Sequence, residues 1–127
     1  MDWLDSNVPI ALIGRDLDGL WARQQAISDN LANFETPGYQ AKSVSFEEKL
    51  QDCLDDAGAT RREKAETIEG VSPRVTVDSG RSERADGNSV DLEQQEIEMA
   101  RTSLNYSCSL AALSDTFSRL RTAIAGK

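Results

Sequence analysis

Residues Asn30–Lys42 read NLANFETPGYQAK, and this stretch ends one structural element and begins another. Asn33 suits the end of a helix, because asparagine tolerates the left-handed backbone conformation that closes a final turn. Thr36–Tyr39 has the pattern of a type II turn, since proline presets the first central position and Gly38 supplies the positive φ of the second. The stretch therefore predicts a helix that stops, a sharp turn, and an aromatic ring presented at Tyr39.

A helix is predicted over residues 8–34, just before this turn. Ser6 or Asn7 suits its N-cap, and Pro9 fits its first turn, where no backbone N–H is missed. Trp21 lies beside the apolar stripe of the helix and either broadens it or faces a neighbouring chain. Apart from one gap at Gln24, the stripe alternates three and four positions as in a coiled coil, and it consists of Ile10, Ile13, Leu17, Leu20, Ile27, Leu31 and Phe34.

The middle of the chain, residues 35–89, continues from the turn into a polar segment. Ser45 is placed to cap a short helix, with Glu48 three residues later as in a capping box. The segment therefore begins with the turn and a short helix.

Residues 55–89 are dominated by charged residues, serine, threonine and glycine. Val71, Val75 and Val77 allow one short strand, with the last two side chains on the same face. Because so polar a segment buries little surface to offset its ordering entropy, we expect it to be mobile in an isolated chain.

A second long helix is predicted over residues 90–127. Asp91 is placed to cap it, with Gln94 three residues later. Its stripe has Glu96 and Ser103 as polar exceptions and otherwise consists of Leu92, Met99, Tyr106, Leu110, Leu113, Phe117, Leu120 and Ile124. The chain, residues 1–127, is thus predicted to be one elongated, mainly α unit whose terminal helices pair as an antiparallel coiled coil.

Two interpretations of this helical pair stay open. Either the hairpin is a self-sufficient core, or other copies or other chains cover the residues that flank the stripes. We favour association, because two such helices alone leave many flanking residues uncovered.

The composition excludes several classes of function. A net charge of −8 argues against a nucleic-acid partner, which requires a positive patch. The chain has no histidine and no glycine-rich phosphate loop, so neither a metal site, a cofactor nor a small-molecule substrate is expected. The sequence therefore offers no case for an enzyme.

Cysteine usage and apolar runs limit the chain further. The spacing of Cys53 and Cys108 is not that of a metal site. We expect two unpaired thiols, with a single disulfide between them as the alternative. No run of about 18 apolar residues predicts a membrane span. The first residues lack the basic start and apolar run of a cleaved signal peptide, so any export is expected to follow another route.

Two motifs resemble the signatures of bacterial flagellar rod and hook proteins. The first stretch matches N-L/I-A-N-x-x-T-P-G-Y-K-A, with Gln40 in place of the usual lysine, and Asp86–Asp91 matches D-G-N-x-V-D. The resemblance implies that an assembly motif is formed by Asn30, Leu31, Asn33, Thr36, Pro37, Gly38, Tyr39, Asp86, Gly87, Asn88, Val90 and Asp91. The two motifs bracket the polar middle segment.

The resemblance implies a structural subunit of the flagellar basal body, in the proximal rod. Its implied partners are copies of itself, other rod proteins such as a FlgC-like subunit, the rod adapter FliE, and the flagellar export apparatus. It also implies a periplasmic location reached by type III export without a cleaved signal peptide. The alternatives are a FlgC-like proximal rod subunit and a cytoplasmic coiled-coil adaptor or export chaperone.

Overall fold

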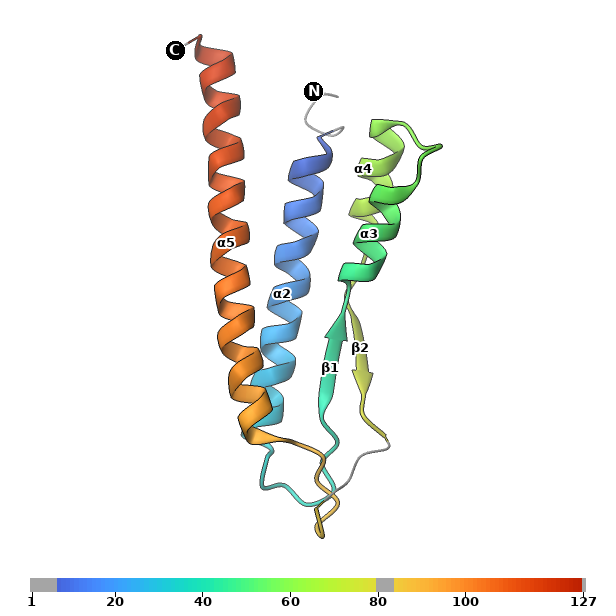
Figure 1. Ribbon diagram of the computed structural model, residues 1–127, viewed down its shortest axis with the longest axis vertical. Helices are drawn as coiled ribbons and strands as arrows, with labels where there is room; N and C mark the ends of the chain where they lie inside the picture. Colours follow the sequence, from blue (N-terminus) through green and yellow to red (C-terminus); the bar gives the residue numbers. More distant parts are fainter. Residues whose placement is uncertain (1–6, 80–83, 127) are drawn as a thin grey trace.

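A computed structural model describes residues 7–79 and 84–126 of the chain. Its elements, labelled as in Figure 1, are α2 (Val8–Ala32), β1 (Lys42–Ser45), α3 (Glu47–Asp55), α4 (Arg61–Glu69), β2 (Arg74–Val77) and α5 (Leu92–Ala125). Long terminal helices packed against each other, with a small two-stranded sheet in the middle, confirm the predicted mainly α fold.

The elements stand side by side along one long axis. Figure 1 shows α2 in the middle, α5 on one side of it, and α3 and α4 on the other. The two terminal helices run in opposite directions, and the last turns of α5 extend past the start of α2. The loops that carry the two motifs lie together at the opposite end of the molecule, next to the strands.

The predicted N-caps of the two long helices are present, but the predicted end of the first differs in its backbone conformation. Asn7 caps α2 by accepting a hydrogen bond from the backbone N–H of Ile10, and Asp91 caps α5 by accepting one from Gln94. Asn33 does end α2, but its φ of −113° and ψ of 15° are not left-handed, so this part of the prediction is wrong. Its backbone N–H instead bonds the carbonyl oxygens of the last turn, which closes the helix without a positive φ.

Phe46 is the largest buried side chain of the core, and α2 is shaped to receive it. A Cβ atom added to Gly19 would lie 2.5 Å from the Phe46 ring, so the helix reaches the ring only because glycine has no side chain. The buried residues packed together in this core are Leu20, Ala26, Val44, Phe46, Leu50 and Ile68. The core therefore lies between α2, β1, α3 and α4.

The prediction for Ser45 is wrong. Ser45 is the last residue of β1, and α3 begins after Phe46, whose side chain makes no capping hydrogen bond. The physical reason is that burial of the Phe46 ring decides where the strand ends and the helix begins. Strand β1 itself was not predicted.

The mobility expected of residues 55–89 in an isolated chain stays a prediction, but the described part of this segment packs against the core through a helix that was not predicted. This helix is α4, which starts with a capping box between Thr60 and Glu63 and buries Ala65 and Ile68 completely. The backbone N–H of Thr60 bonds the Glu63 carboxylate and holds the pKa of Glu63 below its ordinary value. Two apolar residues one helical turn apart suffice because α2 supplies the rest of the core.

The predicted strand near Val75 and Val77 is present as β2. It pairs antiparallel with β1, with Val75 opposite Val44 and Val77 opposite Lys42. A two-stranded sheet gains little stability alone, so this one depends on β1 being attached to α2.

The face of α5 that contacts α2 differs from the predicted stripe at every second position. Met99, Tyr106 and Leu113 are partly buried, as predicted, but the positions between them are Thr102, which is fully buried, and Ser109. Ser109 donates a hydrogen bond to the Asp16 carboxylate of α2. Small polar residues allow the helices to approach closely, and Leu110, one position beyond Ser109, is 50% exposed.

Candidate functional site

The candidate site is the corner between α2 and β1, where the chain reverses. The Tyr39 N–H donates to the Thr36 carbonyl oxygen over 3.2 Å, and Gly38 has a φ of +72°. This is the predicted tight turn with a left-handed glycine at its second central position. Gly87 in the second motif has a φ of +79°, so both motifs turn on a glycine.

The two motifs bind each other through backbone hydrogen bonds. The Gly38 N–H donates to the Asp86 carbonyl oxygen over 2.9 Å, and the Ser89 N–H donates to the Tyr39 carbonyl oxygen over 3.0 Å. The Gln40 side chain adds a 2.8 Å bond to the Gly87 carbonyl oxygen. Motifs that are far apart in the sequence therefore form one structural unit.

Asn88 is the centre of this unit. Its side chain is fully buried, and its Nδ2 donates to the carbonyl oxygens of Asn33 and Thr36, each over 2.8 Å. Its Oδ1 accepts from the Val90 N–H over 2.8 Å. One side chain thus pairs with backbone groups at the end of α2, in the turn and just before the start of α5.

Asn30 makes a matching set of bonds on the other side of the corner. It is also fully buried, and its Nδ2 donates to the Lys42 carbonyl oxygen and to Gln95 of α5. Its Oδ1 accepts from the Lys42 N–H over 2.8 Å and from the Tyr39 hydroxyl over 3.3 Å. Tyr39 therefore uses its hydroxyl inside the chain. The Lys42 ammonium bonds the Asp29 carboxylate, which raises the pKa of Lys42 above its ordinary value.

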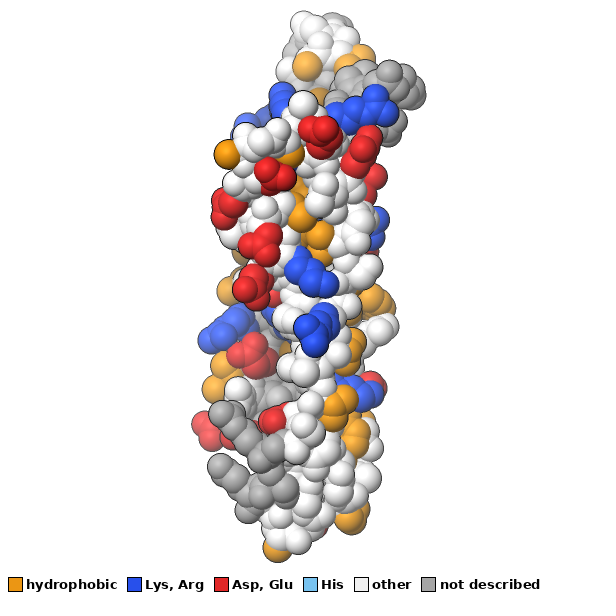
Figure 2. Space-filling view, turned by 90° about the vertical axis from the view of Figure 1, so that its right-hand side faces the viewer, with side chains coloured by type: hydrophobic (Ala, Val, Ile, Leu, Met, Phe, Trp, Pro, Cys, Tyr) orange, Lys and Arg blue, Asp and Glu red, His pale blue; other side chains and the backbone are white. Residues whose placement is uncertain are grey.

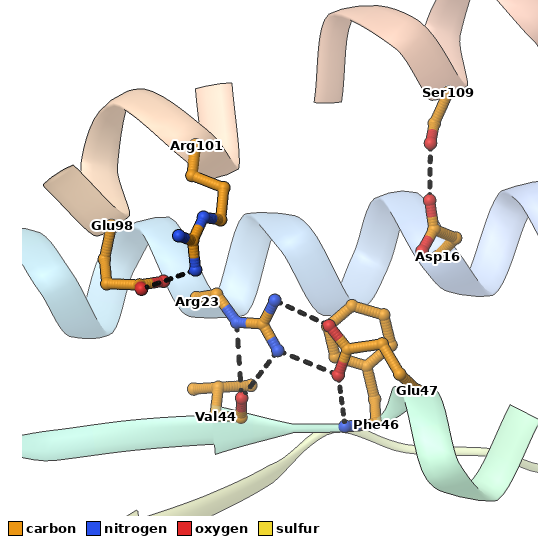
Figure 3. A network of polar contacts seen from close by, with 8 residues as sticks. All are labelled: Asp16, Arg23, Val44, Phe46, Glu47, Glu98, Arg101 and Ser109. Carbon is orange, nitrogen blue, oxygen red and sulfur yellow. Dashed lines mark hydrogen bonds and ion pairs between the residues drawn. The ribbon is translucent and has the colours of Figure 1, made fainter. Parts of the chain in front are cut away.

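A second polar cluster attaches β1 and α3 to the middle of α2 (Figure 3). The Arg23 guanidinium donates to the Val44 carbonyl oxygen over 2.9 Å, forms an ion pair of 2.6 Å with Glu47, and lies 4.9 Å from the centre of the Phe46 ring. Partial burial tends to raise the pKa of Glu47, but hydrogen bonds and the charge of Arg23 outweigh it, so the pKa lies below its ordinary value. This cluster fixes α3 relative to α2.

The corner contains no buried group that awaits a ligand. Within residues 7–79 and 84–126, every buried side-chain nitrogen and oxygen atom has a hydrogen-bond partner. The same residues contain no cluster of acidic or cysteine side chains able to hold a metal ion. None of the described helices combines the length and the hydropathy needed to span a membrane. The buried polar groups of the corner are thus engaged with one another.

The predicted motif residues occupy two kinds of place in the corner. Asn30, Asn88 and Val90 are buried, and Leu31, Asn33, Tyr39 and Gly87 are partly buried. The rest are exposed at its surface, namely Thr36, Pro37, Gly38, Asp86 and Asp91. Whether the surface members contact other subunits stays a prediction.

The predicted helix-packing residues also divide into two groups. Leu20 and Ile27 are buried, whereas Ile10, Ile13, Leu17, Leu31, Phe34, Met99, Tyr106, Leu113 and Leu120 are partly buried. The exposed fractions are 50% for Leu110, 50% for Phe117 and 74% for Ile124. We call these three residues the outer α5 stripe, and nothing in the described chain covers it.

Several residues of the site were not found by sequence reasoning. Gly19, Arg23, Gln95 and Ser89 act through partners that are distant in the sequence, so heptad patterns do not distinguish them. In the sequence, Arg23 only lies off the apolar stripe of α2, which does not indicate its partners.

The face of the molecule formed by α3 and α4 is charged. Figure 2 views the side of α3 and α4, where acidic and basic side chains are interspersed and hydrophobic side chains form only small groups. The larger exposed apolar residues named above lie on α5 instead.

The chain is similar in sequence to known flagellar rod proteins. The chain is 32% identical over 110 residues to the flagellar basal body rod protein FlgB of Aeromonas hydrophila, covering 83% of each chain. It is 31% identical over 112 residues to FlgB of Bacillus subtilis, covering 82% of this chain and 83% of the relative. It is 30% identical over 103 residues to FlgB of Escherichia coli, covering 72% and 75%. No family model matches the chain.

Proposed function

The chain belongs to the FlgB family of flagellar basal body rod proteins and is a structural subunit of the proximal rod, and we propose that it assembles through its terminal helices into an axle that transmits torque. As a rod protein it associates with other components of the basal body. The members of this family are structural proteins.

The observation that carries the proposed mode of assembly is the outer α5 stripe. Leu110, Phe117 and Ile124 recur every seven residues on α5 and are at least half exposed. Exposed apolar residues in a row on a long helix are typical of a surface that another helix covers. Trp21, 56% exposed on α2, adds a large ring to the uncovered surface of the helical pair.

The corner supports the same proposal in a different way. Torque passes through a subunit only if its elements keep their relative positions. Asn30 joins α2 to β1 and, through Gln95, to α5, and Asn88 joins the end of α2 and the turn to the residues just before α5. In this proposal residues 1–127 act as a single elongated unit, and the exposed motif residues Thr36, Pro37 and Gly38 contact a neighbouring subunit.

The partners in this proposal are copies of the chain, a FlgC-like rod protein and the rod adapter FliE. The subunit is exported to the periplasm by the flagellar apparatus without a cleaved signal peptide. No nucleic acid and no small-molecule substrate takes part. These points rest on family resemblance.

The cytoplasmic alternative differs from this proposal in its location. A cytoplasmic adaptor or export chaperone accounts for the helices but not for the relatives, which are named as basal body rod proteins. Fractionation of cells that carry a tagged chain is expected to recover it with purified basal bodies. A pool confined to the cytoplasm contradicts the proposal.

The test of the assembly surface is Phe117→Asp, with Ser118→Asp as the matched control. Both positions are exposed and adjacent, so neither substitution should unfold the isolated chain. The Phe117 variant is expected to lose rods and motility, because a charge then lies in the interface, whereas the control keeps both. Normal rods in the Phe117 variant overturn the proposed surface.

A further inference from the structure

The small sheet has two edges that differ in how their backbone groups are used. On β1, the N–H and carbonyl of Lys42 both bond Asn30, and the Val44 carbonyl oxygen accepts from Arg23. Side chains from α2 therefore close the outer edge of β1. Figure 1 shows β1 between α2 and β2, which leaves β2 as the outermost strand.

The outer edge of β2 is open. In an antiparallel pair, every second residue directs its backbone groups away from the partner strand. Asp78 donates its backbone N–H to the carbonyl oxygen of Ala41, which directly precedes β1, so Asp78 directs its backbone groups toward that strand. By alternation, Val77 and Val75 direct their backbone N–H and carbonyl groups away from β1, just as Lys42, opposite Val77, directs its own groups to Asn30. No described residue bonds their backbone groups, and their side chains are 56% and 50% exposed.

The charges at the ends of this strand make it complementary to itself. Arg74 precedes the two valines and Asp78 follows them, and neither makes an ion pair with a described residue. When the stretch is paired antiparallel with a copy about Thr76, Arg74 lies opposite Asp78 at both ends. The same register places Val75 opposite Val77, and those are the residues whose backbone groups face outward.

We propose that two copies of the chain pair through the open edges of β2, antiparallel and centred on Thr76. The pair forms a four-stranded sheet, with Val75 and Val77 of each copy exchanging backbone hydrogen bonds and with two ion pairs between Arg74 and Asp78. Short strands need several neighbours to be stable, so joining two such sheets benefits both. Natural sheets normally protect an edge of this kind.

This pairing belongs to the subunit before it enters the rod. A two-fold pair has no direction, whereas an axle that grows from a base has one. The edge is short, far below the roughly 1,000 Å² that a stable interface buries, so the pair should form only at high subunit concentration and separate easily. The pairing through β2 does not use the outer α5 stripe. An experiment that disproves it therefore leaves the proposed mode of assembly untouched, and the reverse also holds.

The first test uses cross-linking of the purified full chain with Cys53 and Cys108 replaced by serine. In the proposed register, Thr76 faces its own copy in a non-hydrogen-bonded pair, where side chains approach closely enough for a disulfide. Thr76→Cys is expected to give a disulfide-linked dimer under mild oxidation. Ser43→Cys is the control, because Ser43 lies opposite Thr76 on the closed strand β1 and far from its own copy.

The second test exchanges the charges in the Thr76→Cys background. Arg74→Asp or Asp78→Arg alone places like charges opposite each other and is expected to slow cross-linking about tenfold, while the double exchange restores it. Arg61→Asp, the same charge change on α4, should have no effect. The proposal is overturned if the Thr76 variant does not cross-link at high concentration, if Ser43→Cys cross-links equally, or if the double exchange fails to restore the rate.

Discussion

The motif corner and the outer half of α5 are opposites in composition and in use. At the corner, the polar side chains of Asn30 and Asn88 are fully buried, and their side-chain nitrogen and oxygen atoms all have hydrogen-bond partners. On α5, the large apolar residues Leu110, Phe117 and Ile124 face outward. The usual rule of apolar inside and polar outside is reversed in both places.

The two regions act at different levels, one on the fold of the subunit and the other on its association with other subunits. A buried polar network has one good arrangement, so it specifies the geometry within the subunit. An exposed apolar stripe has no partner inside the chain, so its packing is completed by association. Stability should therefore depend on the corner, and assembly on the stripe.

The largest expected effect tests the corner. Asn88→Ala removes the partners of two carbonyl oxygens and one N–H and is expected to lower the free energy of unfolding by about 3 kcal/mol. Chemical denaturation of the purified chain measures this. Asn105→Ala, an exposed position on α5, is the control and should change it little. If both variants lose the same free energy of unfolding, the buried bonds of Asn88 do not stabilise the corner.

The second test compares the two faces of α5 with one substitution. Leu113→Asp places a charge on the side that contacts α2 and is expected to cost about 2 kcal/mol of stability. Leu110→Asp, three residues earlier on the outer stripe, should change stability by less than about 0.5 kcal/mol but still block assembly. Thermal unfolding and recovery of basal bodies measure the two effects. If Leu110→Asp destabilises the isolated chain as much, the outer stripe is packed within the subunit.

The third test concerns the turn. Gly38→Ala forces a side chain into a backbone with a φ of +72° and is expected to cost about 1 to 2 kcal/mol. Gly14→Ala, in the open middle of α2, should instead stabilise the chain by up to about 1 kcal/mol, since alanine is the better helix former. Denaturation curves of the two variants should therefore shift in opposite directions. A shift in the same direction contradicts the left-handed turn.

The smallest effect is a dependence on pH. The pKa of Glu47 is lowered in the folded chain, so its ion pair with Arg23 stabilises the fold above the ordinary value of 4.5 and is lost as pH falls through the folded value. Glu47→Gln should be less stable than the wild type at pH 7, by less than about 1 kcal/mol because the pair is half exposed. The difference should disappear in strong acid. A constant difference at all pH values would show that charge plays no part.

Local patterns predicted much of the fold, because their physical causes are local. The caps at Asn7 and Asp91, the Thr36–Tyr39 turn and both long helices depend on residues within a few positions of each other. Helix α4 was missed although its capping box was legible, because its two apolar residues looked too few. What completes their burial is α2, more than thirty residues earlier in the chain.

The outer stripe shows a different limit of sequence reasoning. The three-and-four alternation on α5 predicted Leu110 and Phe117 in the same seam as Leu113. A continuous apolar pattern does not say which of two adjacent helical faces meets the intramolecular partner. Ser109, bonded to Asp16, shows which face it is.

The sequence by itself determined where the two long helices begin, where the chain turns and which two motifs mark the boundary, since caps and turns are set by neighbouring residues. Only the tertiary structure decided that Asn88 binds the turn of the first motif, that Gly19 admits Phe46, and that β2 keeps an open edge. These features join residues that are distant along the chain. Their partners become definite only when α2, β1 and α5 are packed together.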